Sequence, residues 1–136
     1  MDIAAVRTAL KNVVKTALPE LTCYPTVPYA VEPPCFYVTG PAITYDVTFG
    51  GDDDMDQWVC RILTSKADED GQTLLDSYLS RGSKSVKLAI EGTPGVPQTL
   101  GGTCDDVHVR RASPARLFEH AGETYYGAEL FVHVIG

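Results

Sequence analysis

The clearest pattern in this sequence is a two-residue alternation over residues 43–49. In this segment, ITYDVTF, apolar side chains alternate with threonine and aspartate, which is typical of a β-strand with one buried face. Residues 57–64, QWVCRILT, are also rich in strand-forming residues and could pair back on the first strand. Together the two segments predict a long β-hairpin with an acidic tip, formed by residues 50–56, GGDDDMD.

A helix is predicted at the start of the chain, over residues 2–18. Asp2 is suited to cap its first turn, and Pro19 would end it. Between them, apolar residues recur at three- and four-residue spacing, which is the period of an amphipathic helix. We expect the buried stripe of this helix to consist of Ile3, Val6, Leu10, Val13 and Ala17.

The rest of the chain contains strands in groups and two further helices. The helices are predicted over 68–79 and 83–91, and the strands over 35–38, 105–112 and 123–136. Strands that are grouped, and do not alternate strictly with helices, indicate an α+β fold. We therefore expect a single domain, residues 1–136, with a mainly antiparallel sheet and the three helices packed on one side.

The composition limits the classes of protein to which the chain can belong. With 44% hydrophobic and 21% charged residues, it is typical of a folded globular protein. Its apolar runs are far shorter than the roughly 20 residues of a membrane span, and its first residues lack the pattern of a signal peptide. We therefore expect a cytoplasmic protein with no membrane partner. The net charge of −7 argues against a dedicated nucleic-acid binder, although an acidic protein can lie beside DNA that it lets pass.

The sequence contains no motif for catalysis or for a structural metal site. Phosphate-binding loops, nucleophile elbows and zinc-protease motifs are absent. The histidines are isolated from one another in sequence, and the basic segment RRASPAR, residues 110–116, predicts a solvated strand end. Because no two cysteines form a CxxC pair, we expect free thiols at Cys23, Cys35, Cys60 and Cys104. The prediction is a protein without enzyme activity, catalytic residues, bound metal or cofactor.

The aspartates of residues 50–56 are the strongest candidates for a functional site: Asp52, Asp53, Asp54 and Asp56. They do not form a calcium loop, because counting from Asp52 places Gln57 and Leu63 where glycine and glutamate are required. Neighbouring aspartates also point in divergent directions and seldom converge on one ion. A solvated hairpin tip is the favoured interpretation. The alternative is a small metal-dependent phosphoryl-transfer enzyme that uses these aspartates.

A basic stripe on the first helix is the second candidate. Arg7, Lys11 and Lys15 are four residues apart and therefore share one side of the helix, which we expect to lie away from its buried stripe. Separate acidic and basic surfaces would permit head-to-tail contacts between identical subunits, and such contacts close into rings when the rotation between subunits allows it.

The order of these segments resembles the tail terminator, or tail completion, proteins of long-tailed bacteriophages. The resemblance spans nearly the full chain and is carried by these segments: the opening helix, PYAVEPPCFYV, YDVTFGGDDDMDQWVCRILTSKADEDGQTLLDSYL, SVKLAIE, TLGGTCDDVHVRRAS and YYGAELFVHVIG.

The resemblance implies a structural protein of the virion, at the head-proximal end of the tail. It would assemble in the host cytoplasm as a homo-oligomeric ring, six-fold in this family, on the last ring of the tail tube protein. The ring would stop tube polymerisation and provide a docking surface for the head-completion or stopper protein, with DNA only as passing cargo. The alternatives are a head–tail connector or stopper protein one ring further up, and a monomeric adaptor.

For this function the resemblance implies that the aspartates line the lumen or contact a neighbouring ring. A lumen lined with aspartate would repel DNA phosphates, and the repulsion between six copies would need screening by salt or Mg²⁺. We therefore expect ring formation to respond to divalent ions.

Overall fold

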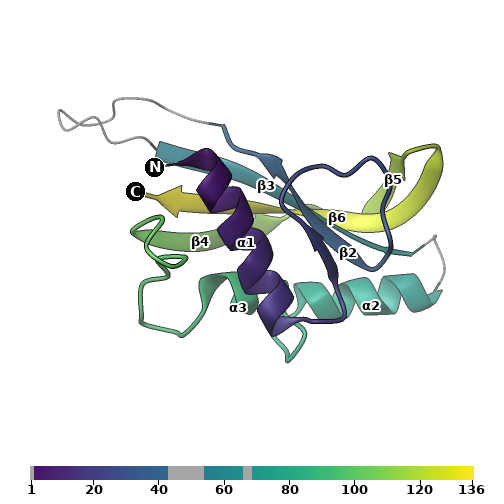
Figure 1. Ribbon diagram of the computed structural model, residues 1–136. Coiled ribbons are helices and arrows are strands. Elements are labelled where there is room, and N and C mark those ends of the chain that lie inside the picture. The colour runs from purple at the N-terminus through teal and green to yellow at the C-terminus, as the bar shows by residue number, and fades with distance from the viewer. Residues whose placement is uncertain (1, 43–53, 66–68) are drawn as a thin grey trace.

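The computed structural model describes residues 2–42, 54–65 and 69–136 and shows an α+β fold (Figure 1). The described strands form one sheet in the order β1-β2-β3-β6-β4, with β5 also paired to β6. Among the described strand pairs, only that of the short β1 with β2 is parallel, and the others are antiparallel. The predicted fold class is confirmed. The strands are β1 (Thr22–Tyr24), β2 (Cys35–Gly40), β3 (Asp54–Ser65), β4 (Asp106–Ala112), β5 (Arg116–His120) and β6 (Glu123–Ile135).

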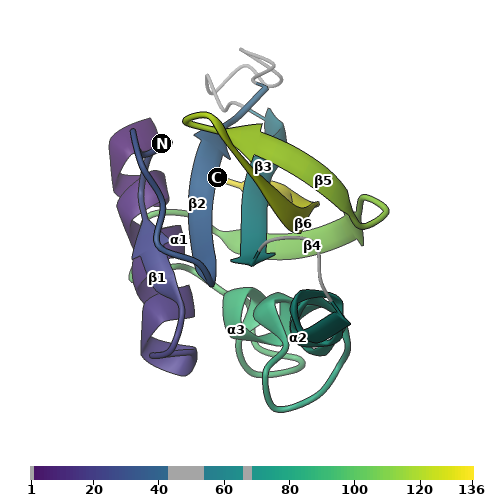
Figure 2. The same ribbon diagram turned by 90° about the vertical axis from the view of Figure 1, so that its right-hand side faces the viewer.

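The helices lie together on one side of the sheet (Figure 2). They are α1 (Ile3–Ala17), α2 (Glu69–Leu79) and α3 (Val86–Glu91). Asp2 caps α1 by accepting a 3.0 Å hydrogen bond from the backbone N–H of Ala4, and Ser85 caps α3 in the same way through Leu88. The prediction for α1 is confirmed, whereas α3 begins three residues later than expected because its cap is Ser85 and not an earlier residue.

The buried stripe of α1 is rotated from the predicted one. Val6, Leu10 and Val14 are fully buried, whereas Val13 is half-buried. Ala17, expected in the core, is exposed. The four-residue spacing of the buried side chains, which Leu18 continues, follows one row of the helix surface. The prediction of Ala17 as a core residue was wrong, whereas Val13 packs against the edge of the core while half-buried. Both rows of the helix surface satisfy the helical period, and the position of the sheet decides which of them is fully buried.

The core on the helix side is built by alternating strand residues. On β6, Ala128, Leu130, Val132 and Val134 are buried against the helices, as their alternation predicts. A smaller cluster lies on the opposite face of the sheet and contains Cys35, Tyr37, Leu63 and Phe118. Strand β2 contributes to both clusters, so CFYV reads as a continuous apolar run and not as an alternation.

Strand β3 pairs with two strands over residues 59–63, where β2 lies on one edge and β6 on the other. Its pairing with β2 contains a register shift between Val38 and Gly40. Strand β3 also begins at Asp54, three residues before the expected start. Residues 43–49 and the proposed acidic tip before Asp54 lie outside the described residues.

Strand β5 was not predicted, because the basic segment before it, RRASPAR, was interpreted only as a solvated strand end. It pairs with the first part of β6 through a two-residue turn between His120 and Glu123. Ala121 and Gly122 adopt φ values of 51° and 81° in this turn, which match the twist of a tight hairpin. Both β5 and β4 therefore pair with β6, at its beginning and its end respectively.

Candidate functional site

A network of charged side chains lies on the sheet face that the helices leave uncovered. Arg61 on β3 and Glu129 on β6 are paired across the strands, and Arg61 Nη2 donates a 3.0 Å hydrogen bond to Glu129 Oε2. Arg116 on β5 donates to the other carboxylate oxygen at 2.8 Å. Arg61 Nη1 also donates to Tyr37 Oη at 3.1 Å. One carboxylate therefore joins two arginines from two different strands.

Phe118 on β5 contacts both guanidinium groups of this network. The Cζ atoms of Arg61 and Arg116 are each 4.4 Å from the centroid of its ring, within the range of an attractive cation–π contact. Burial would raise the pKa of the Glu129 carboxyl, but the hydrogen bonds from both arginines outweigh it and lower that pKa below its ordinary value. The network therefore contains an ionised Glu129 and holds β5 against the sheet.

Two further arginines extend this face along β4. Arg111 pairs with Phe131 across the strands, and its Cζ lies 3.9 Å from the centroid of the phenyl ring. Arg110 Nη2 lies 2.6 Å from His133 Nδ1. Both arginine residues are exposed. We call this surface the arginine face and define it by Arg61, Arg110, Arg111 and Arg116.

The arginine face was not predicted from the sequence, although the sequence contains a signal for it. Arg61 and Glu129 are single charges within otherwise apolar strand segments, VCRIL and GAELF. A charge at such a position needs a partner on a neighbouring strand, but the sequence does not show which strand that is. Arg61 and Glu129 are 68 residues apart in the chain, and only the β3–β6 pairing brings them together.

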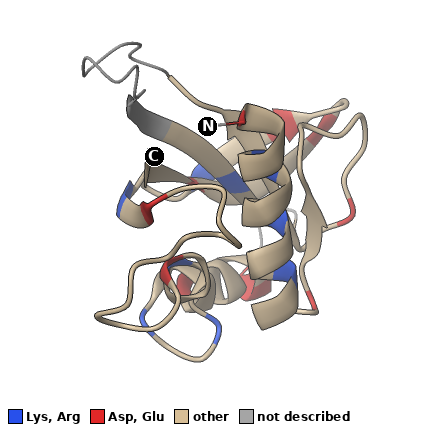
Figure 3. Cartoon of the chain, turned by 60° about the vertical axis from the view of Figure 1, so that its left-hand side comes forward, with Lys and Arg blue, Asp and Glu red and all other residues tan. Residues whose placement is uncertain are grey.

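The predicted basic stripe on α1 lies beside strand β2 and the segments on either side of β1 (Figure 3). Arg7 is half-buried and donates to the carbonyl oxygens of Val38 at 3.0 Å and of Pro25 and Thr39 at 3.4 Å. Lys15 Nζ donates to the carbonyl oxygens of Pro19 and Leu21 at 2.8 and 3.0 Å. Both cations thus tie α1 to its own chain. Lys11, between them, is half-buried.

The structure places only part of the acidic segment. The backbone of Asp54 and Asp56 belongs to β3, and Asp54 is paired with Ile135 near the end of β6. Asp106 on β4 is paired with the same residue from the other side. Asp52 and Asp53 lie outside the described residues. The acidic segment and the basic stripe remain predictions as sites of contact between subunits.

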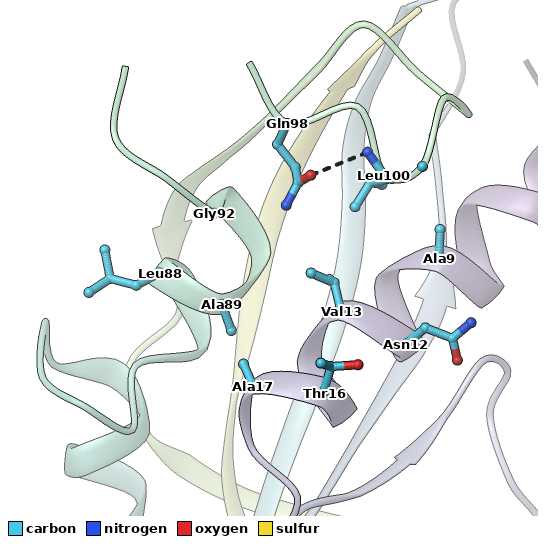
Figure 4. A pocket seen from close by; sticks show the side chains of 11 residues that line it. Ala9, Asn12, Val13, Thr16, Ala17, Leu88, Ala89, Gly92, Gln98 and Leu100 are labelled. Carbon is cyan, nitrogen blue, oxygen red and sulfur yellow. Dashed lines mark hydrogen bonds between the residues drawn. The ribbon is translucent and has the colours of Figure 1, made fainter. Parts of the chain in front are cut away.

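A hollow lies between α1, α3 and the loop after α3 (Figure 4). It has a volume of about 610 Å³ and opens widely to solvent. Its lining is mainly small and apolar, and no ionisable side chain belongs to it. The side chain of Gln98 is already bonded, to the carbonyl oxygen of Ile90 and the N–H of Leu100. The lining of this groove therefore contains no acidic or basic side chain.

The cysteines are free thiols, as predicted. Burial raises the pKa of Cys35 and of Cys60 to about 12, and that of the half-buried Cys23 to about 11. Among the described residues, no three histidine, cysteine, aspartate or glutamate side chains are close enough together to hold a metal ion. Asp52 and Asp53 are not among the residues to which this statement applies.

Comparison with protein-family models and with curated proteins finds no match to this chain. Within the described part of the chain, no helix is both long and apolar enough to cross a membrane.

Proposed function

We propose that this protein is a structural subunit that works by assembling with copies of itself, as the tail terminator of a long-tailed bacteriophage. The proposal assigns it to the head-proximal end of the tail, as a ring, with six subunits by analogy with that family. There it would stop polymerisation of the tail tube protein and receive the head-completion or stopper protein, while DNA passes through the lumen. The resemblance in segment order, described above, supplies this identity.

The structural observation that carries the proposal is the arginine face. Arginine and aromatic side chains are the residue types that are enriched in protein–protein interfaces. Here they lie on a sheet face without helices, with Arg111 against Phe131 and both Arg61 and Arg116 against Phe118. The described groove between α1 and α3, by contrast, offers no group for catalysis. The arginine face and the lining of the groove are both consistent with a protein that works by binding other protein subunits.

Capping of tail tubes is the direct test. The protein would be added to tail tube protein during polymerisation, and tube length would be measured by electron microscopy. We expect shorter tubes, with one ring of added protein at one end, in proportion to the amount added. Tubes of unchanged length, with no added protein at their ends, would contradict the proposal.

Assembly in solution is the second test. Light scattering after size exclusion, over a range of protein concentrations, would give the subunit number with and without Mg²⁺. We expect a closed species of about six subunits that forms more readily with Mg²⁺. Replacement of Asp52, Asp53 and Asp54 by asparagine should abolish the response to Mg²⁺, because the repulsion that the ion screens would be gone.

A further inference from the structure

The segment between β1 and β2 displays an aromatic side chain to solvent. Tyr29 is 95% exposed, the largest fraction among the exposed large apolar side chains of the described residues, and Val27 is 51% exposed. We call residues 26–30 the Tyr29 loop. A tyrosine side chain buries roughly 150–250 Å² when it is enclosed, and tyrosine is one of the residue types that carry most of the binding energy at interfaces. The Tyr29 loop therefore presents an anchor that its own chain leaves unburied.

Contacts with the rest of the chain hold the Tyr29 loop in place. The carbonyl oxygen of Pro28 accepts a 2.7 Å hydrogen bond from His120 Nε2, on the hairpin of β5 and β6. Just beyond the loop, the N–H of Glu32 donates to Tyr24 Oη at 3.3 Å. Proline at positions 25 and 28 restricts the backbone further. An anchor that is presented in a fixed conformation binds with a smaller entropic cost than one on a loop that must first become ordered.

The groove between α1 and α3 matches this anchor in size and in polarity. Its volume of about 610 Å³ lies within the range of cavities that enclose small ligands. Ala9, Val13 and Leu88 give it an apolar lining, and Leu88 is 36% exposed. Asn12 and Thr16 belong to the same lining (Figure 4), and within the described part of the chain their side chains make no hydrogen bond. They offer partners to a tyrosine hydroxyl, which needs one when its ring is buried.

The charges beside the loop and beside the groove are opposite in sign. Glu32, which follows the Tyr29 loop, is exposed. Arg81 is exposed as well and lines a neighbouring hollow that shares Leu88 with the groove. The carboxylates of that hollow, Glu91 and Asp106, already accept hydrogen bonds from their own chain. Complementary charges favour the meeting of loop and groove and disfavour the contact of either surface with itself.

We propose that the groove between α1 and α3 receives the Tyr29 loop of a second copy of this chain. The ring of Tyr29 lies in the groove, with its hydroxyl bonded to the polar side chains of the lining. The contact joins two different surfaces of identical subunits, so it continues from one subunit to the next and can close into a ring. This inference rests on the proposed ring function and names a contact that builds the ring.

Helix α1 separates the loop from the groove within one subunit. Arg7 and Lys15 donate to carbonyl groups next to the two ends of β1, whereas Ala9 and Val13 line the groove. At 3.6 residues per turn, these two pairs lie roughly half a turn apart around the helix. Figure 1 shows the segment between β1 and β2 and helix α3 on opposite sides of α1. Tyr29 therefore reaches the groove of another copy and not its own.

The test removes the anchor and the groove one at a time. Tyr29→Ser deletes the ring at an exposed position, and Ala17→Asp places a carboxylate in the lining of the groove, at a position that is exposed in the free subunit. We expect each variant alone to self-associate roughly 30-fold or more weakly than the unmodified chain. Sedimentation velocity and light scattering over a range of concentrations would measure this change.

An equimolar mixture of the two variants gives a sharper result. The intact groove of the Tyr29→Ser chain should receive the intact loop of the Ala17→Asp chain, and no second contact remains to continue the assembly. We therefore expect pairs with one chain of each kind and no larger species.

Matched controls make the same kinds of change outside the contact. Val96→Ser removes another exposed apolar side chain, and Ala4→Asp adds a carboxylate to an exposed position of α1 that does not line the groove. Both should leave self-association unchanged. Tyr29→Phe keeps the ring and loses only the hydroxyl, and should weaken self-association by about 10-fold or less. Circular dichroism and the thermal midpoint would establish that each variant is folded.

Photochemical cross-linking locates the contact directly. Tyr29 would be replaced by the photoreactive p-benzoylphenylalanine in a mixture of isotope-labelled and unlabelled chains. Mass spectrometry of the linked peptides should show position 29 of one chain joined to α1, α3 or the loop after α3 of another.

Pairs in the mixture, weak association of each variant alone and cross-links into the groove support the inference. It is overturned if either folded variant associates as the unmodified chain does, if the mixture forms no pairs, if the cross-links lie elsewhere, or if the unmodified chain is monomeric at every concentration. The tube-capping experiment judges the proposed function separately. Capping by a full ring of the Tyr29→Ser variant would leave the proposed function in place and show that this contact is wrong.

Discussion

Arg61 and Glu129 face each other across β3 and β6, and their side chains form an ion pair of 3.0 Å. Their side chains are only 24% and 15% exposed, so Arg61 would be left with an uncompensated charge in a partly dry environment if Glu129 were removed. Arg116 adds a second cation to the same carboxylate from β5. The Arg61–Glu129 pair therefore fixes the register of β3 against β6, and the Arg116–Glu129 pair fixes the position of β5.

Replacement of Glu129 by glutamine should lower the free energy of unfolding at pH 7 by about 2 kcal/mol, a value reduced from that of a fully buried pair because water reaches these groups. Because the pKa of Glu129 is lowered in the folded protein, its contribution is present above its ordinary pKa of 4.5 and is lost as the pH falls through the lowered pKa. Urea unfolding between pH 7 and pH 3 would show a smaller loss of stability on acidification for the variant. An identical acid dependence for both proteins would contradict this assignment.

Gly127 is expected to be intolerant of any side chain. Its position on β6 is so close to β3 that a Cβ would overlap with the carbonyl oxygen of Ile62 and lie 2.8 Å from Leu63 Cδ2. Gly127→Ala should cost about 3 kcal/mol, because backbone atoms cannot move aside without disturbing the sheet. Gly82→Ala is the control, since no atom lies within 4 Å of its Cβ position. Equal thermal midpoints for the two variants would show that β6 does not approach β3 in this way.

Val13 and Val14 offer a test of which side of α1 is buried. Val14 is fully buried and Val13 is half-buried. Val14→Ala should lower the free energy of unfolding by about 2 kcal/mol and Val13→Ala by about 1 kcal/mol or less. The change in helix propensity is the same in both variants, so the difference measures burial alone. Chemical denaturation would report it, and the reverse order would restore the stripe that the sequence predicted.

Variants at Arg7 and Lys11 distinguish a structural role of the basic stripe on α1 from a role in assembly. Arg7→Met removes the donor to the carbonyl oxygens of Val38, Pro25 and Thr39, and should lower the free energy of unfolding by about 2 kcal/mol. Lys11→Met, one turn further along the stripe, should change it by less than about 0.5 kcal/mol. If the stripe does contact a neighbouring subunit, Lys11→Met would weaken self-association without this loss of stability. Calorimetry and light scattering on both variants would distinguish the two roles.

The thiols should be almost inert in the folded protein at pH 8. Since burial raises the pKa of Cys35 and Cys60 to about 12, hardly any reactive thiolate is present. A colorimetric disulfide reagent should modify Cys23 first, because it is only half-buried, and should reach all four thiols in urea. As the pH rises above 9.0, the ordinary cysteine pKa, stability should fall, because the unfolded chain loses thiol protons that the folded chain retains. Rapid modification of Cys60 in the native state would contradict its burial.

Several elements follow from short-range patterns in the sequence. The helical period and the polar cap at Asp2 predict α1, and the alternation over residues 128–134 predicts which side of β6 is buried. These features depend on residues a few positions apart, and the geometry of a single helix or strand relates such residues directly. The α+β class follows from their order in the chain.

The tertiary structure alone decided which surfaces these elements form. The row of α1 that is buried, the pairing of β3 with β2 and β6, and the position of β5 all depend on contacts between distant segments. The same holds for the arginine face, because Arg61, Arg111 and Arg116 come from three different strands that only β6 connects. Local periodicity determines which side of a strand is apolar, but the free energy of packing the whole chain determines which strands become neighbours, and hence which charges meet.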